Sequence, residues 1–308
     1  MFDAIFLQSL VAGAVVAGIP LLLAGLGEQV SERAGVLNVG LEGMMLAGAF
    51  AGFFVVWLTG SIWAGLLAGV VGGAIVAALM AVLTIGLSLN QIIVGIGLTL
   101  ASEGITTMLH RSLFSRTYPR LPAVESLSIP GLSSIPVIGP ALFAQHPVFY
   151  LSLLLVGGQS WVLRSTFVGL DLHAAGDKPQ ALDAAGVSVS RTRSLAILYA
   201  GAMAGAGGAY MSVIAAGLFI PFMTNGAGFV GIVLAMLAAG RPLWVLIGAA
   251  VFGGGLSLVT GLQVAGTAIS TDFVQMLPYV LVLSMLLLFS RRARLPAALG
   301  LPYLRGTR

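Results

Sequence analysis

The sequence contains no cysteine, one lysine and three histidines among 308 residues. The absence of cysteine excludes disulfide bonds and thiol chemistry. The lysine, Lys178, does not follow the glycine-rich pattern of a phosphate-binding loop, so we do not expect this chain to hydrolyse ATP. His110, His146 and His173 lie far apart in the sequence and belong to no metal-binding or hydrolase motif. We therefore expect no catalytic residue, no metal site and no cofactor, and a membrane enzyme is only a minor alternative.

Charge is also scarce. Only 8% of the residues are charged and 58% are hydrophobic, whereas about 25% of a soluble domain is charged. One membrane-spanning helix needs about 20 apolar residues, and the longest run without a charge or histidine must hold more than one such helix. The uncharged runs cover residues 4–27, 43–102, 147–163, 194–240, 242–271 and 273–290. The chain is thus expected to be an integral membrane protein.

These runs are long and continuously apolar, unlike the short alternating strands of a membrane barrel. We predict an all-α polytopic helix bundle, a single transmembrane domain over 1–308 with about nine transmembrane helices. The segment 226–240 is short and broken by glycine, which indicates a half-helix or re-entrant piece. The predicted spans are 5–27, 37–58, 62–87, 90–109, 147–163, 194–216, 226–240, 243–262 and 271–290.

The distribution of basic residues predicts the orientation, because cytoplasmic loops are enriched in Lys and Arg. If 171–193 is a cytoplasmic loop, the outer loop 110–146 holds three arginines and the other eleven of the fourteen basic residues lie inside. This places the N-terminus outside and the tail 291–308 in the cytoplasm. The net charge of +4 then reflects topology, and no basic patch interleaved with aromatic residues indicates nucleic-acid binding. The N-terminus is interpreted as a retained first helix, because it lacks the positive region of a secretory signal.

The loop 171–193 is the one long polar stretch in the second half of the chain, with the sequence DLHAAGDKPQALDAAGVSVSRTR. Asp177 is a plausible N-cap, Pro179 suits the first helical turn, and Gly186 suits the position just after a helix. We predict a short cytoplasmic helix here. Such a helix is too short to be stable alone, so a second protein on the cytoplasmic side is its natural support.

An ion-coupled secondary transporter remains an alternative, because such carriers place ionisable groups inside the membrane. The candidates are Glu42, Glu103 and Asp272. We interpret Glu42 as an interfacial carboxylate bonded to nearby backbone, Glu103 as a pore-lining or helix-packing residue, and Asp272 as a cap at a helix start. None of the three has the features of a buried proton relay.

Forty-two glycines are many for helices, but small residues let membrane helices approach closely. Gly69-x-x-x-Gly73 and Gly201-x-x-x-Gly205 are therefore predicted packing motifs.

The loop 171–193 also carries a resemblance to a known family. HAAGDKPQALDAAGVSVSRTR resembles the coupling segment of permease subunits in ABC importers of the ribose and branched-chain amino acid type. Within that superfamily, SERAGVLNVGLEGMMLAGAFAG, NQIIVGIGLTL and PAALGLPYLRG resemble the nucleoside-type permeases that work with a basic-membrane-protein-like binding lipoprotein. The family more often has arginine where His173 stands, a glutamate–asparagine pair at Asp177 and Lys178, and glutamate at Gln91.

The resemblance implies a multi-pass permease of the bacterial inner membrane that carries a small polar solute, with a nucleoside favoured and a simple sugar as the alternative within the superfamily. It implies three protein partners: a second permease subunit, a cytoplasmic ABC ATPase and an external substrate-binding lipoprotein. The residues predicted to contact the ATPase are Asp177, Lys178, Pro179, Asp183 and Gly186. The residues predicted to line the substrate path are Asn38, Glu42, Asn90, Gln91 and Asn225.

Overall fold

The computed structural model describes residues 4–124, 126–133, 135, 138–264 and 295–303, together with positions 276, 280, 283, 284 and 287. Within this part of the chain the regular structure is almost entirely helical, as predicted. The helices are α1 (Ala4–Arg33), α2 (Leu41–Thr59), α3 (Ile62–Ala81), α4 (Gln91–Phe114), α5 (Ile138–Phe143), α6 (Pro147–Ser165), α7 (Phe167–Asp177), α8 (Pro179–Ala184), α9 (Val189–Ala209), α10 (Ala227–Ala238) and α11 (Pro242–Val264). Short π-helical turns, Val82–Gly86 and Tyr210–Ala215, extend α3 and α9, and β1 (Leu127–Ser128) pairs with β2 (Ala144–Gln145) in antiparallel register.

Six of these helices are long and apolar enough to cross a membrane, or seven if the bent pair α6–α7 forms one span. The predicted count of about nine is therefore not confirmed for the part of the chain that the structure describes. With α6–α7 counted as a seventh span, two predicted spans account for the remaining difference. The segment 226–240 forms only the 12-residue α10, in line with the predicted half-helix, and most of the span 271–290, including Asp272, lies outside the described residues.

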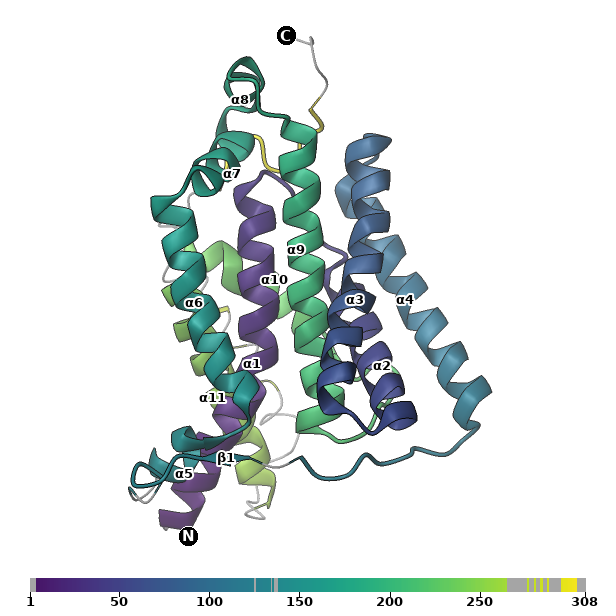
Figure 1. Cartoon of the computed structure of the whole chain (residues 1–308), viewed down its shortest axis with the longest axis vertical. Helices are drawn as coiled ribbons and strands as arrows, with labels where there is room; N and C mark the ends of the chain where they lie inside the picture. Colours follow the sequence, from purple (N-terminus) through teal and green to yellow (C-terminus); the bar gives the residue numbers. More distant parts are fainter. Residues whose placement is uncertain are drawn as a thin grey trace.

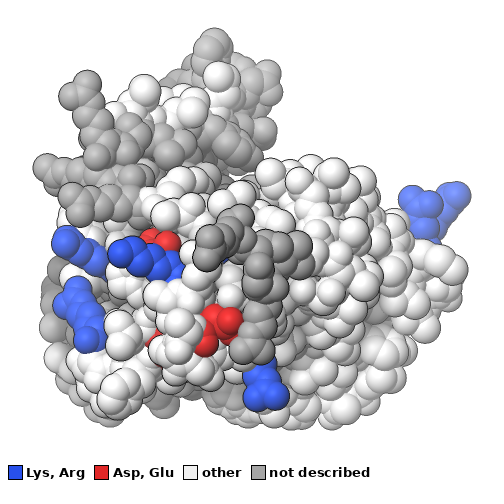
Figure 2. Space-filling view, turned by 90° about the horizontal axis from the view of Figure 1, so that it is seen from above, with Lys and Arg blue, Asp and Glu red and all other residues white. Residues whose placement is uncertain are grey.

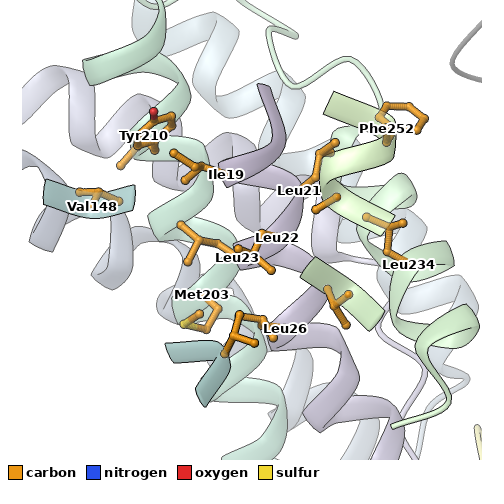
Figure 3. Packing of buried hydrophobic residues seen from close by; sticks show 14 of the residues in the cluster. Ile19, Leu21, Leu22, Leu23, Leu26, Val148, Met203, Tyr210, Leu234 and Phe252 are labelled. Atoms are coloured by element: carbon orange, nitrogen blue, oxygen red, sulfur yellow. The ribbon is translucent and has the colours of Figure 1, made fainter. Parts of the chain in front are cut away.

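Helices α1 and α9 form the centre of the bundle. Helix α1 packs against α9, α10 and α11, while α9 packs against α1, α2 and α3. Figure 1 shows α1 and α9 side by side, with α6 on one flank and α2 to α4 on the other. Their apolar residues are buried around much of each helix, as expected for helices inside a membrane bundle. In Figure 3, Leu22, Leu23 and Leu26 of α1 lie beside Met203 of α9, and these four residues belong to one buried cluster.

The predicted glycine motifs are confirmed as packing sites. A methyl group on Gly73 would collide with the carbonyl oxygen of Gly201, and one on Gly205 would collide with the carbonyl oxygen of Gly69. Only glycine lets the backbones of α3 and α9 approach this closely. Two segments more than 100 residues apart in the sequence are thereby brought into direct contact.

The polar connections are sorted to the two ends of the bundle. Figure 1 shows the N-terminus, α5 and β1 at one end, and α7, α8 and the yellow C-terminal segment 295–303 at the other. Arg33 donates a hydrogen bond from its Nη2 to the carbonyl oxygen of Gly240 at 3.2 Å, so the α10–α11 turn also lies at the α8 end. Seen from that end, the surface carries several basic and a few acidic side chains among uncharged ones (Figure 2). The segments predicted to share one side of the membrane thus share one end of the molecule.

Candidate functional site

Two regions of the structure bear on the predicted sites: the α8 end and an open cavity beside α1, α10 and α11. At the α8 end, the predicted loop 171–193 is largely helical. Helix α7 follows α6 after a bend of 73°, and α9 already begins at Val189. The six-residue α8 lies between α7 and α9. We call α7 and α8 together the coupling module.

The prediction that Asp177 caps α8 is wrong. Asp177 is the last residue of α7, and Lys178 occupies the N-cap position without a capping hydrogen bond from its side chain. The reason is that α7 extends through Asp177, and the Lys178 N–H still donates to the carbonyl oxygen of Ala174 at 2.9 Å. The Asp177 carboxylate instead lies 3.0 Å from Nδ1 of His173, one turn earlier on α7.

The two ends of α8 otherwise follow the prediction. Pro179 occupies the first turn, where its missing N–H needs no partner. Gly186 has a φ of +87°, and the Val187 N–H donates to the carbonyl oxygen of Leu182 at 3.2 Å. Glycine adopts this left-handed conformation without the steric cost that other residues incur, and the turn it forms ends the helix.

One side of α8 is anchored and the other is exposed. Leu182 is buried in a small cluster with Ala175 of α7 and Val189 of α9. Asp183 and Gly186 border a hollow of about 310 Å³ that Tyr303 also lines. Within residues 178–186 the exposed positions are Lys178, Gln180, Ala181, Ala184, Ala185 and Gly186. The α8 part of the module therefore presents a narrow surface of mostly small side chains and one cation away from the bundle.

The second region is a cavity of about 860 Å³ between α1, α10, α11 and residues 211–225. Its wall is mainly apolar, with the aromatic rings of Phe222 and Phe252 among the lining residues. Thr224 and Asn225 supply polar groups immediately before α10. Asn225 has a φ of +44°, a left-handed conformation that asparagine tolerates better than most residues. Of the five residues predicted for the substrate path, Asn225 is the one that lines this cavity.

Glu42 is held by backbone instead. The residue is 4% exposed, and its Oε1 and Oε2 accept hydrogen bonds from the N–H groups of Gly226 at 2.8 Å and Gly228 at 2.6 Å. The carboxylate thus caps the start of α10, where the helix dipole favours negative charge. The predicted bonding of the Glu42 carboxylate to backbone agrees with this geometry, although its partners lie far away in the sequence. Its place at the membrane interface stays a prediction. Because residues of α10 line the cavity, the hydrogen bonds of Glu42 fix the position of one part of the cavity wall.

Of the other three path candidates, Asn90 and Gln91 lie at the start of α4 and Asn38 lies just before α2. Asn90 caps α4, where its Oδ1 accepts from the N–H groups of Ile92 at 3.0 Å and Ile93 at 3.2 Å. Gln91 accepts from the N–H of Leu37 at 2.9 Å through Oε1. The fully buried Asn38 donates its backbone N–H to a carboxylate oxygen of Glu28 at 3.1 Å. The hydrogen bonds from Leu37 to Gln91 and from Asn38 to Glu28 hold residues 34–40, which we call the α1–α2 connector.

The burial of Arg193 at the α8 end was not predicted from the sequence. Arg193 is 1% exposed and donates to the carbonyl oxygens of Ala34, Ala175 and Leu301 at 3.1, 3.1 and 2.7 Å. In the sequence, Arg193 looks like one more basic residue of a cytoplasmic loop. A signal that could have indicated its burial is its place within the first turns of a long apolar helix.

Glu103 does not line the large cavity. It borders a separate hollow of about 590 Å³ beside α4, together with Arg111 and Phe222. Phe222 lines both spaces.

Comparisons with known proteins agree with this architecture. The family model described as "Branched-chain amino acid transport system / permease component" matches residues 10–289. A solved structure titled as an inward-facing conformation of a putative metal-chelate type ABC transporter has a similar fold, with a TM-score of 0.51 over 93% of this chain and 90% of that one at 15% identity.

Three relatives are similar over most of their length. The nucleoside ABC transporter permease protein NupC of Lactococcus lactis is 32% identical and aligns over 97% of this chain and 98% of its own. The guanosine ABC transporter permease protein NupQ of Bacillus subtilis is also 32% identical, with 98% of both chains aligned. The putative glucose ABC transporter permease protein TsgC13 of Haloferax volcanii is 38% identical over 86% of this chain and 80% of its own.

Proposed function

The chain belongs to the branched-chain amino acid transport system / permease component family, and from this membership we propose that it carries nucleosides inward across the membrane as part of an ATP-driven importer. It is a multi-pass ABC transporter permease subunit, and such subunits are not themselves enzymes. The ATP is therefore hydrolysed by another subunit. The observation that favours a nucleoside is the cavity of about 860 Å³.

The wall of that cavity suits a ligand that has an aromatic face. A nucleobase stacks on aromatic side chains, and Phe222 and Phe252 lie on the cavity wall. Asn225 offers an amide donor and acceptor, which can bind a base edge or a ribose hydroxyl. A nucleoside can bury its base against the apolar wall while its fewer hydroxyls use Thr224 and Asn225. The near full-length similarity to two nucleoside permeases supports the same substrate class.

Glucose is the second candidate, because the glucose permease relative has the higher identity of the three. Each hydroxyl of a sugar loses free energy on leaving water unless it finds a hydrogen-bond partner. The largely apolar wall offers few such partners. We therefore favour the nucleoside.

The coupling module is the proposed ATPase contact. Its exposed surface of small side chains around Ala181 and Ala184 can approach another protein closely, and Lys178 adds a positive charge. Buried Leu182 ties this surface to α7 and α9. Closure of the ATPase on binding ATP would push on α8 and so shift the bundle between two states, as coupling requires different contacts in each state.

The proposed assembly contains a second permease subunit, a cytoplasmic ATPase and an external substrate-binding lipoprotein in the bacterial inner membrane. The α8 end faces the cytoplasm and the N-terminus faces outward, following the bias of basic residues. In this orientation Asp177, Pro179, Asp183 and their neighbours meet the ATPase. The cavity then lies towards the half of the bundle that contains the N-terminal part of α1.

A transport assay with the four components in proteoliposomes tests this function. Labelled uridine and labelled glucose are supplied on the lipoprotein side, with ATP on the ATPase side. We expect ATP-dependent uptake of uridine that excess unlabelled guanosine inhibits, and no uptake of glucose. ATP-dependent uptake of glucose without uptake of uridine would contradict the nucleoside assignment and favour the second candidate.

A further inference from the structure

Residues 295–303 close over the α8 end of the bundle (Figure 1). The N–H of Ala298 donates to the carbonyl oxygen of Gly176 in α7 at 2.8 Å. The N–H of Gly300 donates to the carbonyl oxygen of Gly35 in the α1–α2 connector at 3.0 Å. This short segment therefore joins the coupling module to the connector that follows α1.

Arg193 binds the same three pieces of chain from the inside. Its guanidinium donates to Ala34 of the connector, Ala175 of the module and Leu301 of the C-terminal segment. A guanidinium has five N–H donors in a rigid planar fork, so it can hold three carbonyl oxygens in fixed directions at once. Three backbone dipoles also compensate the burial of its charge.

Glycines make this close approach possible. Gly35 has a φ of +85°, and a side chain there would lie 2.9 Å from Nη2 of Arg193 and 3.0 Å from the Cα atom of Gly176. A methyl group on Gly176 would collide with the carbonyl oxygen of Arg33. The backbones of the connector and of α7 therefore touch beneath the C-terminal segment.

The connector leads from this point towards the cavity. It is bound by Gln91 at the start of α4 and by Glu28 of α1. It runs directly into α2, whose Glu42 caps α10. Residues of α10 line the cavity. A continuous set of hydrogen-bonded contacts thus joins the coupling module to the cavity wall.

We propose that Arg193 and residues 295–303 form a clasp that locks the coupling module to the α1–α2 connector, so that movement of α8 reaches the cavity. This inference rests on the proposed function as an ABC permease and adds the positioning residues that transmit its motion. With an intact clasp, the module and connector move as one body. Without it, α8 can follow the ATPase while the connector stays behind.

The test measures solute imported per ATP hydrolysed by the four-component complex in proteoliposomes. Arg193→Gln replaces the guanidinium, which has five N–H donors, by an uncharged amide with two. Ala298→Pro removes the N–H that binds Gly176 and leaves the rest of the segment in place. Arg193→Gln should lower the solute-to-ATP ratio about tenfold and retain ATP hydrolysis, because the clasp loses hydrogen bonds from a charged group. Ala298→Pro should act in the same direction, and the double variant should lose no more than Arg193→Gln alone.

Two controls isolate the clasp. Arg191→Gln removes an exposed arginine in the same helical turn, and Leu301→Ala removes an exposed side chain but keeps the carbonyl oxygen that Arg193 binds. Both should keep the wild-type ratio. A wild-type ratio in both Arg193→Gln and Ala298→Pro would overturn the clasp. If Arg193→Gln does not assemble, Ala298→Pro alone decides between the two results. Uptake by the wild-type complex tests the proposed function separately, so a failure of the clasp leaves that function standing.

Discussion

Glu42 and Gly228 join the start of α2 to the start of α10: Oε2 of the glutamate accepts a hydrogen bond from the glycine N–H at 2.6 Å. A methyl group on Gly228 would lie 2.6 Å from the Cα atom of Glu42, so the two backbones also touch. The pair therefore fixes where α10 begins, and α10 carries part of the cavity wall.

Glu42→Ala should loosen this helix start. It leaves the N–H groups of Gly226 and Gly228 without their charged acceptor, and hydrogen bonds to charged groups contribute about 1.5–3 kcal/mol each. We expect a lower apparent melting temperature of the purified protein in detergent and reduced uptake by the complex. Glu42→Gln, which keeps one oxygen acceptor, should be intermediate. Equal melting temperatures for the wild type and Glu42→Ala would contradict the capping role.

The α3–α9 contact predicts a sharp difference between glycines. Gly73→Val should disrupt the bundle, because even a methyl group at this position meets the carbonyl oxygen of Gly201, and overpacking of this kind costs about 1–3 kcal/mol or more. Gly97→Val is the matched control on α4, where the added carbon meets no atom within 4 Å. Thermal unfolding should separate the two variants, and similar melting temperatures would argue against close backbone packing at Gly73.

Breaking α8 should uncouple transport without removing the protein from the membrane. Ala184→Pro removes a helical N–H and clashes with the preceding turn, at a cost of about 3 kcal/mol. The position is exposed and outside the membrane-spanning helices, so insertion should be normal while uptake and ATPase association fall. Ala184→Ser is the control that keeps the helix. Normal uptake by the proline variant would mean that 171–193 is a simple connector.

Asn225 should matter for substrate recognition. Asn225→Gly removes the amide and suits the left-handed backbone at this residue, so a loss of function reports on the side chain. We expect KM for nucleoside uptake to rise about tenfold, the equivalent of one lost hydrogen bond in a desolvated site. An unchanged KM would remove Asn225 from the substrate path.

Single cysteines can test the orientation, because the natural chain has none. Ser126→Cys lies in the exposed connection between α4 and α5, and Gln180→Cys lies on the exposed surface of α8. An impermeant thiol reagent added to whole cells should label only the cysteine at 126. Labelling at 180 and not at 126 would reverse the topology.

Local signals in the sequence were enough for some features and not for others. Pro179 lies in the first turn of α8 and Gly186 lies just after its end, as predicted. Both positions could be predicted because each of these residues has a backbone preference that holds in any context. Helix α7 was missed although Thr166, whose hydroxyl accepts from the N–H of Gly169 at 3.4 Å, is a usable N-cap signal. The polar stretch 171–193 looked like a loop because its charged residues follow an apolar span, but it contains the end of α7, all of α8 and the start of α9.

Long-range partners were beyond local reasoning. Glu42 meets backbone groups 184 and 186 positions away, and Arg193 meets carbonyl oxygens from three separate segments. Backbone acceptors and donors leave no trace in residue identity, so neither partner set could be deduced from spacing. Of the five polar residues predicted for the path, Glu42, Asn90 and Gln91 accept hydrogen bonds from backbone N–H groups. The side-chain amide of Asn38 instead donates to Sδ of Met44 at 3.3 Å, so none of these four residues lines the cavity.

The most direct test of the account asks whether ATP at the partner subunit changes the cavity. Asn225→Cys is introduced into the naturally cysteine-free chain, the full complex is reconstituted, and the labelling rate at 225 with an impermeant thiol reagent is measured with and without ATP and vanadate. We predict that the trapped nucleotide changes the labelling rate, that added nucleoside slows it in the nucleotide-free state, and that Ala184→Pro in α8 abolishes the response to nucleotide. A labelling rate that is the same in every nucleotide state would contradict the claim that α8 and the cavity are coupled.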